Sequence, residues 1–242
     1  MATQHRGGDT RRQYQLVADR IRSLIESGGF SAGARLPAER ELALQLGVSR
    51  PSLREALIAL EIEGRIEIRG GSGVYVASLP PLEDAGTPSL GESPAELMHA
   101  RLVLESAVIM LAAARVTKAG LQRVQEALEA MRAELADGLK PVEADRRFHL
   151  SIAEMSGNSV LVGMVGSLFD GRHSPLSLRM CGQVESDLTW KDALAEHEAI
   201  LQALEARDPQ AASAAVCRHL IASHARWIGD GAEIPARGAL TL

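Results

Sequence analysis

The sequence predicts a mainly α-helical chain in two parts: three helices with a β-hairpin, then an all-α antiparallel helical bundle. Apolar residues make up 46% of the chain but aromatic residues only 3%, a composition that favours helix over sheet. Two short β-prone runs surround a glycine-rich turn at 70–73. From residue 94 onward nearly every segment has the 3.6-residue apolar period of a helix.

The 242 residues divide at a segment rich in proline, glycine and serine, which reads as a linker. We therefore expect a first domain at 1–78, a linker at 79–93, a helical domain at 94–230 and a tail at 231–242. Residues 1–78 carry a net charge of +2, and the remainder carries −7. A basic first domain joined to an acidic second one suggests two different tasks.

No targeting or membrane signal is evident in the sequence. The longest apolar run, Ala107 to Ala114, is too short to cross a bilayer, and the N-terminus lacks the apolar core of a signal peptide. Cys181 and Cys217 form no close-spaced motif, which fits a reducing compartment. We expect a cytoplasmic protein without a membrane partner.

The first domain has the pattern of a winged helix-turn-helix. Tyr14–Ser27 is amphipathic, a second helix follows Pro37, and Gly47 ends that helix before Ser49 caps a third. Gly64 ends the third helix, and two predicted strands follow, Arg65–Arg69 and Val74–Ala77. In this arrangement the third helix enters the major groove of DNA by its N-terminus.

The N-terminus of that third helix carries side chains suited to DNA. Arginine bonds guanine edges or phosphate, and hydroxyl groups bond phosphate. The candidate contacts are Ser49, Arg50, Ser52 and Arg54, with Arg69 beside the wing. The alternative for an isolated arginine is a solvated helix charge, but the whole arrangement favours DNA.

Leu36 to Val76 resembles the DNA-binding domain of GntR-family bacterial transcription regulators. The resemblance rests on the stretches LPAERELA, GVSRPSLREAL and EGRIEIRGGSGVYV. It implies contact of a double-stranded operator by Arg40, Ser49, Arg50, Ser52, Arg54, Gly70 and Gly71. The segment ALIALEIEGRIEIRGGSGVYV is also similar to regulators of hexuronate or sugar-acid catabolism.

The second domain consists of periodic segments with short separators, a pattern typical of antiparallel neighbours in a bundle. The predicted helices are 94–116, 118–136, 142–155, 159–181 with a break around 171–175, 191–206 and 209–228.

Polar residues interrupt the apolar stripes of three of these helices. Asp145 and His149 share the face of Phe148, while His197 and His219 lie on or near the inward stripes of two later helices. One buried histidine is usually a satisfied core residue. Three imidazoles and a carboxylate on facing helices are also a usual metal site, with Zn²⁺ first and Ni²⁺, Fe²⁺ or Mn²⁺ as alternatives.

Residues 95–228 resemble the FCD ligand-binding domain of the FadR subfamily. The resemblance rests on ARLVLESAVIMLAAAR, DRRFHLSIAEMSGN, EHEAILQALEARDPQAA and the late RHL. It implies that Asp145, His149, His197 and His219 hold a divalent metal ion. It also implies that Arg101 meets an effector acid, although pairing with Glu105 at i+4 remains an alternative. Asn158 either reaches the same pocket or caps the next helix.

Together these features predict a regulator that is not an enzyme. A homodimer would bind a palindromic operator, and a small organic acid at the metal would control operator affinity, most simply by relieving repression. The alternatives are a metal-dependent enzyme using the same three histidines and aspartate, or a direct metal sensor.

Overall fold

The computed structural model describes residues 12–78 and 90–228. The chain divides into two compact units, Met1–Ser93 and Pro94–Leu242, which are described separately. The predicted tail and most of the predicted linker lie outside the described residues. The described part of that linker, residues 90–93, packs within the first unit: Leu90 is buried, the Tyr14 hydroxyl donates to the Gly91 carbonyl at 3.0 Å, and Ser93 donates to Glu55 at 2.8 Å.

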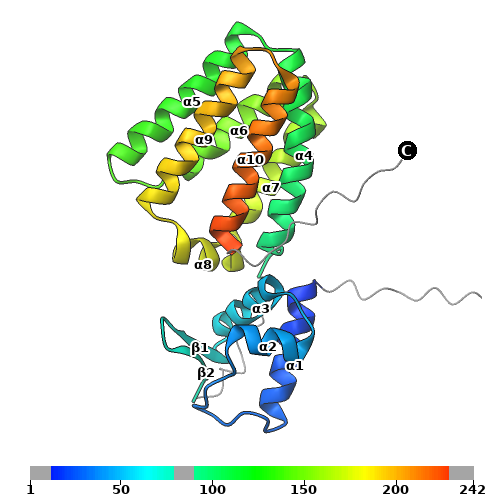
Figure 1. The fold of residues 1–242 in the computed structure, drawn as a ribbon, viewed down its shortest axis with the longest axis vertical. Coiled ribbons are helices and arrows are strands. Elements are labelled where there is room, and N and C mark those ends of the chain that lie inside the picture. The colour runs from blue at the N-terminus through cyan, green and yellow to red at the C-terminus, as the bar shows by residue number, and fades with distance from the viewer. Residues whose placement is uncertain (1–11, 79–89, 229–242) are drawn as a thin grey trace, which may run out of the picture. The chain divides into compact units, whose positions relative to one another are not determined.

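The first unit is a winged helix-turn-helix, as predicted (Figure 1). Its apolar core lies between the helices and the inner face of the hairpin, with Ile21, Leu53 and Leu60 almost completely buried. The elements are α1 (Gln13–Glu26), α2 (Glu39–Leu46), α3 (Arg50–Ile62), β1 (Ile66–Arg69) and β2 (Gly73–Val76).

The turn between α2 and α3 follows from two residues. Gly47 ends α2 with φ of 64°, a left-handed conformation that side chains other than glycine adopt at a cost. Ser49 then caps α3 by accepting a hydrogen bond from the Ser52 backbone N–H at 3.2 Å. The cap leaves the first turn of α3 exposed at Arg50, where a major-groove contact would form.

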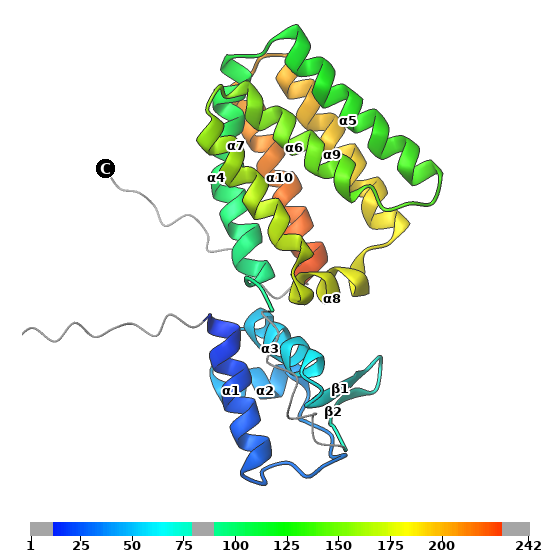
Figure 2. The ribbon, with the colours of Figure 1, turned by 180° about the vertical axis from the view of Figure 1, so that it is seen from behind.

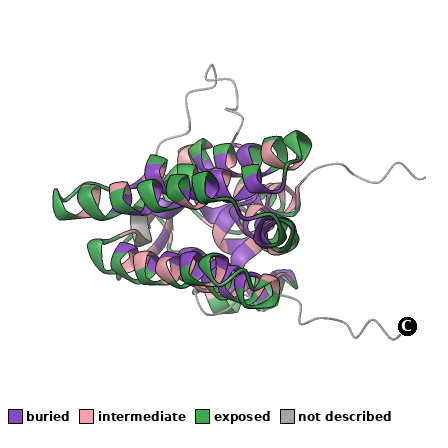
Figure 3. Ribbon diagram, turned by 90° about the horizontal axis from the view of Figure 1, so that it is seen from above, coloured by how far each residue is buried: buried purple, intermediate pink, exposed green. Residues whose placement is uncertain are grey.

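The second unit is an all-α bundle, also as predicted (Figures 1 and 2). Its buried residues face inward between the helices, and exposed residues cover the outer faces (Figure 3). The elements are α4 (Pro94–Ala114), α5 (Lys118–Ala136), α6 (Val142–Met155), α7 (Ser159–Asp170), a 3-10 turn η1 (Gly171–His173), α8 (Pro175–Val184), α9 (Asp187–Glu205) and α10 (Pro209–Ile228).

The largest difference from the predicted helix boundaries is at the start of α9. The break at 171–175 is present, but α9 begins at Asp187 rather than at Lys191. Ser186 and Thr189 form a reciprocal capping box, in which each side chain bonds the other residue's backbone N–H. The extra turn brings Trp190 onto the buried face of α9.

Helix α4 is the one helix in the described part of the chain that is long and apolar enough to cross a membrane by composition. Its buried face nevertheless carries Arg101 and Glu105, and it packs against α6, α7 and α10. Such contacts are those of a core helix in a bundle. Its outer face is also apolar, with Val103, Met110 and Leu111 exposed.

Candidate functional site

The residues predicted to read DNA lie together at the exposed end of α3 and on α2. Arg40, Ser49 and Arg50 are exposed, and Ser52 and Arg54 are half-buried. The hydroxyl groups of Ser49 and Ser52 lie 2.9 Å apart, at the first turn of α3.

The charges of these arginines are available to a partner. Other arginines of the first unit pair with a carboxylate, such as Arg22 with Asp19 and Glu63, and Arg65 with Glu26. Within residues 12–78 and 90–93, no ion pair involves Arg40, Arg50 or Arg54. An uncompensated guanidinium on an exposed helix end favours a phosphate or guanine contact.

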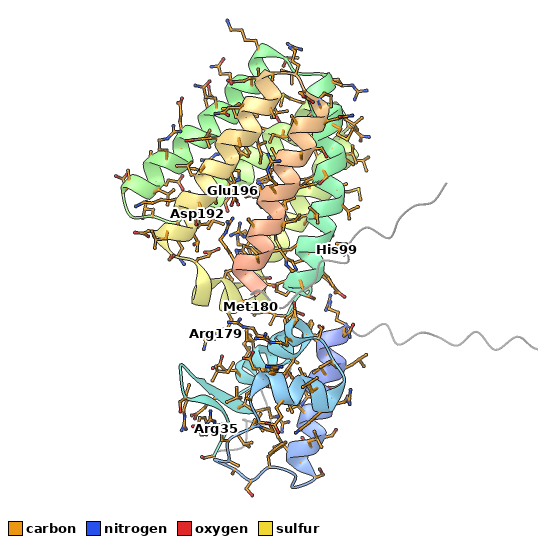
Figure 4. All side chains as sticks on the ribbon, in the orientation of Figure 1. Arg35, His99, Arg179, Met180, Asp192 and Glu196 are labelled. Carbon is orange, nitrogen blue, oxygen red and sulfur yellow. The ribbon has the colours of Figure 1, made fainter. Side chains whose placement is uncertain are left out.

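The wing adds a basic edge. Arg69 lies 4.3 Å from the ring centre of Tyr75 and pairs with Glu67 at 2.8 Å, and the exposed Gly70 and Gly71 form the tip. Sequence reasoning missed Arg35, whose exposed side chain lies over Gly73 (Figure 4). A Cβ at Gly73 would lie 2.8 Å from Nε of Arg35, so the glycine makes room for this guanidinium.

In the bundle, the four predicted metal ligands meet. Asp145 and His149 come from α6, His197 from α9 and His219 from α10, and one ligand atom from each lies within 4.8 Å of all the others. Nε2 of His197 is 3.2 Å from both Nε2 of His149 and Oδ1 of Asp145. All four residues are buried, with 0–4% of their surface exposed.

These separations fit one metal ion. Two donor atoms that each bind an ion at about 2.0–2.2 Å lie about 3–3.5 Å apart. Helix spacing explains the α6 pair, since residues four apart share a face. The ring of Phe148 packs against the imidazoles of His149 and His197, with ring centres 5.5 Å and 4.6 Å apart.

Two carboxylates orient the imidazoles of His149 and His219 by hydrogen bonds to the ring nitrogens that face away from the cluster. Nδ1 of His149 donates to Glu105 on α4, and Nδ1 of His219 donates to Glu196 on α9 at 2.8 Å. Each bond leaves Nε2 as the free ligand atom, the usual arrangement of a histidine that binds a metal. Glu196 lies beside α10 (Figure 4), where Arg226 holds both of its oxygens at 2.7 and 2.9 Å.

The directions in which the pKa values of the four residues are shifted indicate which side chains carry a charge. Burial would lower the pKa of His149, but Glu105 and Asp145 outweigh it and raise the pKa above 6.5. Burial lowers the pKa of His197, and burial followed by the charge of His197 lowers the pKa of His219 to about 3. Burial would raise the pKa of Asp145, but His149 and His197 hold it well below 3.8. One proton on His149 therefore accompanies the ionised Asp145.

A pocket opens against this cluster. Its walls include the ligands Asp145 and His219, and its other lining residues are Arg101, Arg172, Glu185, Thr189, Trp190, Ala193, Ser223, Arg226 and Trp227. The pocket is thus placed so that a ligand inside it could touch the metal ligands.

The two residues predicted to bind an effector have different surroundings. Arg101 lines the pocket and also donates to Glu105 at 2.7 Å, the i+4 pairing that the sequence offered as an alternative. Its contact with an effector acid stays a prediction. Asn158 is exposed, and its side-chain oxygen accepts from Val160 and Leu161 as the cap of α7. It is not among the residues that line this pocket.

Two residues that line the pocket, Trp190 and Trp227, were not singled out from sequence as binding residues. Arg172 holds Asp145 and Glu185 at 2.9 Å each, and Trp190 and Trp227 form a wall beside it. The sequence did contain a signal, because these are the only two tryptophans in the chain. Each lies about two helical turns from a predicted ligand, Trp190 from His197 and Trp227 from His219.

Comparisons with known proteins identify both domains. Residues 13–76 match the model of the bacterial regulatory proteins of the gntR family, and residues 96–222 match the FCD domain. The chain is 36% identical over 216 residues to the Uxu operon transcriptional regulator of Escherichia coli strain K12, covering 86% of this chain and 84% of that protein.

Two further relatives come from the same organism. The Exu regulon transcriptional regulator is 35% identical over 219 residues, with 88% of this chain and 83% of that protein covered. The L-lactate dehydrogenase operon regulatory protein is 36% identical over 231 residues, with 88% and 86% covered. These relatives are regulators, not enzymes. The chain therefore belongs to the GntR family of DNA-binding transcriptional regulators, in the FadR-like group that carries a C-terminal FCD domain.

Proposed function

We propose that this protein is a repressor whose operator affinity is set by a small organic acid bound beside a divalent metal ion in the FCD domain. The observation that carries the proposal is the pocket itself. It brings the buried guanidinium of Arg101 and two of the four clustered metal ligands, Asp145 and His219, to one cavity. Cationic groups facing a metal site form a natural receptor for a carboxylate.

The protein's own residues would do most of the binding. Asp145, His149, His197 and His219 would hold the ion, while Glu105 and Glu196 keep two imidazoles in the right tautomer. When bound, a divalent ion such as Zn²⁺ would supply positive charge and open coordination positions for a carboxylate oxygen. Ni²⁺, Fe²⁺ or Mn²⁺ suits the same nitrogen and oxygen donors.

A hexuronate is the first effector to test. The sequence is similar to the Uxu operon and Exu regulon regulators across both domains. L-lactate is the second, because a lactate dehydrogenase operon regulator is similarly close. Both compounds place a hydroxyl or a ring oxygen beside a carboxylate and can chelate an ion.

The apolar outer face of α4 and α7 supports a homodimer. Val103, Met110 and Leu111 on α4, with Val160 and Met164 on α7, are 43–68% exposed, and the two helices pack against each other. The partner on this face would be a second copy of the chain. A palindromic operator has two equal half-sites, which two identical DNA-binding domains related by a two-fold axis would occupy. Burial of this face would also explain why α4 is apolar on both sides.

Operator binding in the presence of acid and metal tests the proposal. An operator selected by the purified protein from a random duplex library would be titrated by fluorescence anisotropy, with and without Zn²⁺ and glucuronate or lactate. We expect acid and metal together to weaken binding at least about tenfold, a coupling of about 1.4 kcal/mol. An effect of metal alone would instead identify a metal sensor.

Variants separate the metal site from a general loss of fold. His197→Ala should abolish metal binding and the acid response while leaving DNA affinity without effector unchanged. His173→Ala, which removes an exposed histidine that lies 3.9 Å from Glu143, is the matched control. If His197→Ala responds to acid like the original protein, the pocket does not work through the metal cluster.

A further inference from the structure

Arg35 is fixed beside the wing by its own backbone. Residues 33–36 run antiparallel to β2, with Arg35 opposite Tyr75 and the Leu36 N–H donating to the Val74 carbonyl at 2.9 Å. Neighbouring residues of an extended segment point to opposite sides, so Leu36 is buried in the core of the first unit and Arg35 is exposed. The fold therefore presents Arg35 on the solvent side of the hairpin.

Gly73 makes room for the guanidinium of Arg35 (Figure 4). A Cβ atom added at Gly73 would lie 2.8 Å from Nε, 3.1 Å from Nη2 and 3.3 Å from Cζ of Arg35, so the guanidinium itself lies over the first residue of β2. Gly73 also has φ of 121°, which residues with a side chain rarely adopt. The tip residues Gly70 and Gly71 are exposed and carry no side chain either. The wing thus leaves this guanidinium accessible, beside bare backbone.

The other arginine of the wing, Arg69, is compensated by a carboxylate. Its Nε and Nη2 donate to Glu67 at 3.1 and 2.8 Å, and its guanidinium lies over the ring of Tyr75. The Glu67 side chain is 57% exposed, so a phosphate that approached Arg69 would also meet a negative charge. Among residues 12–78 and 90–93, no ion pair involves Arg35. The positive charge that the wing offers to DNA therefore comes from Arg35.

The position of this charge favours a phosphate over a base. A side chain that reads a base edge has to project into a groove, as the first turn of α3 allows Arg50 to do. Arg35 instead lies across the wing backbone, which holds its guanidinium at the surface of the protein. The sugar-phosphate backbone of a duplex accepts about half or more of all protein–DNA hydrogen bonds, and these contacts position a protein without reading sequence.

We propose that Arg35 is the phosphate anchor of the wing: it binds one operator phosphate and positions the first unit on the duplex without reading a base. Arg69 has a different task. It lies on β1 and stacks on Tyr75 of β2, so it holds the two strands of the hairpin together. The proposal concerns DNA contact alone and does not depend on the metal ion or on the organic acid.

The salt dependence of DNA binding distinguishes a phosphate contact from a base contact. The full-length protein, without added metal or acid, would be titrated by fluorescence anisotropy against its selected operator and against an unrelated duplex of equal length, at several KCl concentrations. In Arg35→Ala both affinities should fall by the same factor, about tenfold. The slope of log affinity against log salt concentration should become shallower by about 0.9 per bound copy, because one phosphate contact is lost.

Three further variants serve as comparisons. Arg35→Lys keeps the charge and should retain most of the affinity and of the salt slope, since lysine also binds phosphate. Arg69→Ala should weaken binding by less than about threefold, because Glu67 already compensates that charge. Arg65→Ala removes the same charge from the same unit, where Arg65 pairs with Glu26, and should leave the slope unchanged.

The outcomes of these titrations decide the role of Arg35. Unchanged affinity and slope in Arg35→Ala would show that this side chain does not touch DNA, and a loss confined to the selected operator would show that it reads a base. An equal change of slope in Arg65→Ala would reduce the effect to overall charge. Any of these results overturns the proposal. If Arg35→Ala does not fold, Arg35→Gln, which keeps a long polar side chain without the charge, is judged by the same slope.

Discussion

Glu105 joins His149 to Arg101. Its Oε2 accepts a hydrogen bond from Nδ1 of His149, and its Oε1 accepts from Nε of Arg101 at 2.7 Å. One buried carboxylate on α4 thus contacts both a candidate metal ligand and a wall of the effector pocket. Burial would raise the pKa of Glu105, but Arg101 and then His149 lower it to about 2. The group is therefore ionised at neutral pH and able to orient both partners.

Replacing Glu105 should weaken metal binding without removing any ligand. Glu105→Gln removes the charge that orients His149, and loss of such an outer carboxylate typically costs 10–100-fold in metal affinity. We expect a loss of about this size in a competition titration with a metal chelator. Glu129→Gln, on the exposed face of α5, is the control for a lost surface charge. Equal metal affinity in the two variants would show that Glu105 only supports packing.

Metal binding should release a proton at pH 6.5. Burial would lower the pKa of His149, but Glu105 and Asp145 outweigh it and raise the pKa, so this imidazole keeps its proton to higher pH than a free histidine. The pKa values of His197, His219 and Asp145 are all lowered, so these ligands are already deprotonated. An ion must displace the His149 proton, and metal affinity should therefore fall as the pH falls.

Calorimetry in two buffers of different ionisation enthalpy measures that proton directly. The apparent binding enthalpy should differ between the buffers in proportion to the difference in their ionisation enthalpies. In Glu105→Gln the release should shrink, because the main group that raises the pKa of His149 is gone. Heats that do not depend on the buffer would mean that His149 is neutral before the metal binds.

Site residues could be predicted from the sequence where they share a helix face with buried apolar residues. The stripe rule placed Asp145, His149 and His197 inward, because the 3.6-residue period alone determines a helix face. Glu196 directly precedes His197 and lies beside that stripe, so only the packing of α9 on α10 gives it His219 and Arg226 as partners. Pairings between helices depend on how each helix is rotated about its axis and shifted along its neighbour. The apolar pattern of one helix does not determine either quantity.

The same limit applies to the pocket walls and to the first unit. Trp190 and Trp227 are far apart in sequence and meet one pocket only because α9 and α10 are neighbours. Arg35 precedes a loop and joins the wing through a bridge between its backbone and Tyr75. By contrast, the helix-turn-helix follows from local signals, the glycine at position 47 and the cap at Ser49, and could be predicted in full.

Removing the Arg50 side chain should abolish most specific operator binding. Arg50 is exposed at the first position of α3, and within the described residues it has no carboxylate partner. Loss of one base or phosphate contact costs about 1–3 kcal/mol, so Arg50→Ala should weaken operator binding by about 10–100-fold. Arg132→Ala removes a positive charge from the exposed face of α5 and should leave binding unchanged. Equal behaviour of the two variants in an anisotropy titration would place the recognition surface elsewhere.

A charge on the outer face of α4 should separate the proposed dimer. Met110 is 43% exposed beside Leu111, in the middle of the apolar face formed by α4 and α7. Met110→Glu would place two equal charges near the two-fold axis, where they repel each other and lose hydration. Sedimentation should show at least about a tenfold higher dimer dissociation constant, and operator affinity should fall because two linked heads bind better than one. Leu188→Glu adds the same charge at an exposed leucine on α9 and should remain dimeric. If Leu188→Glu dissociates and Met110→Glu does not, the second copy binds to the α9 side of the bundle instead.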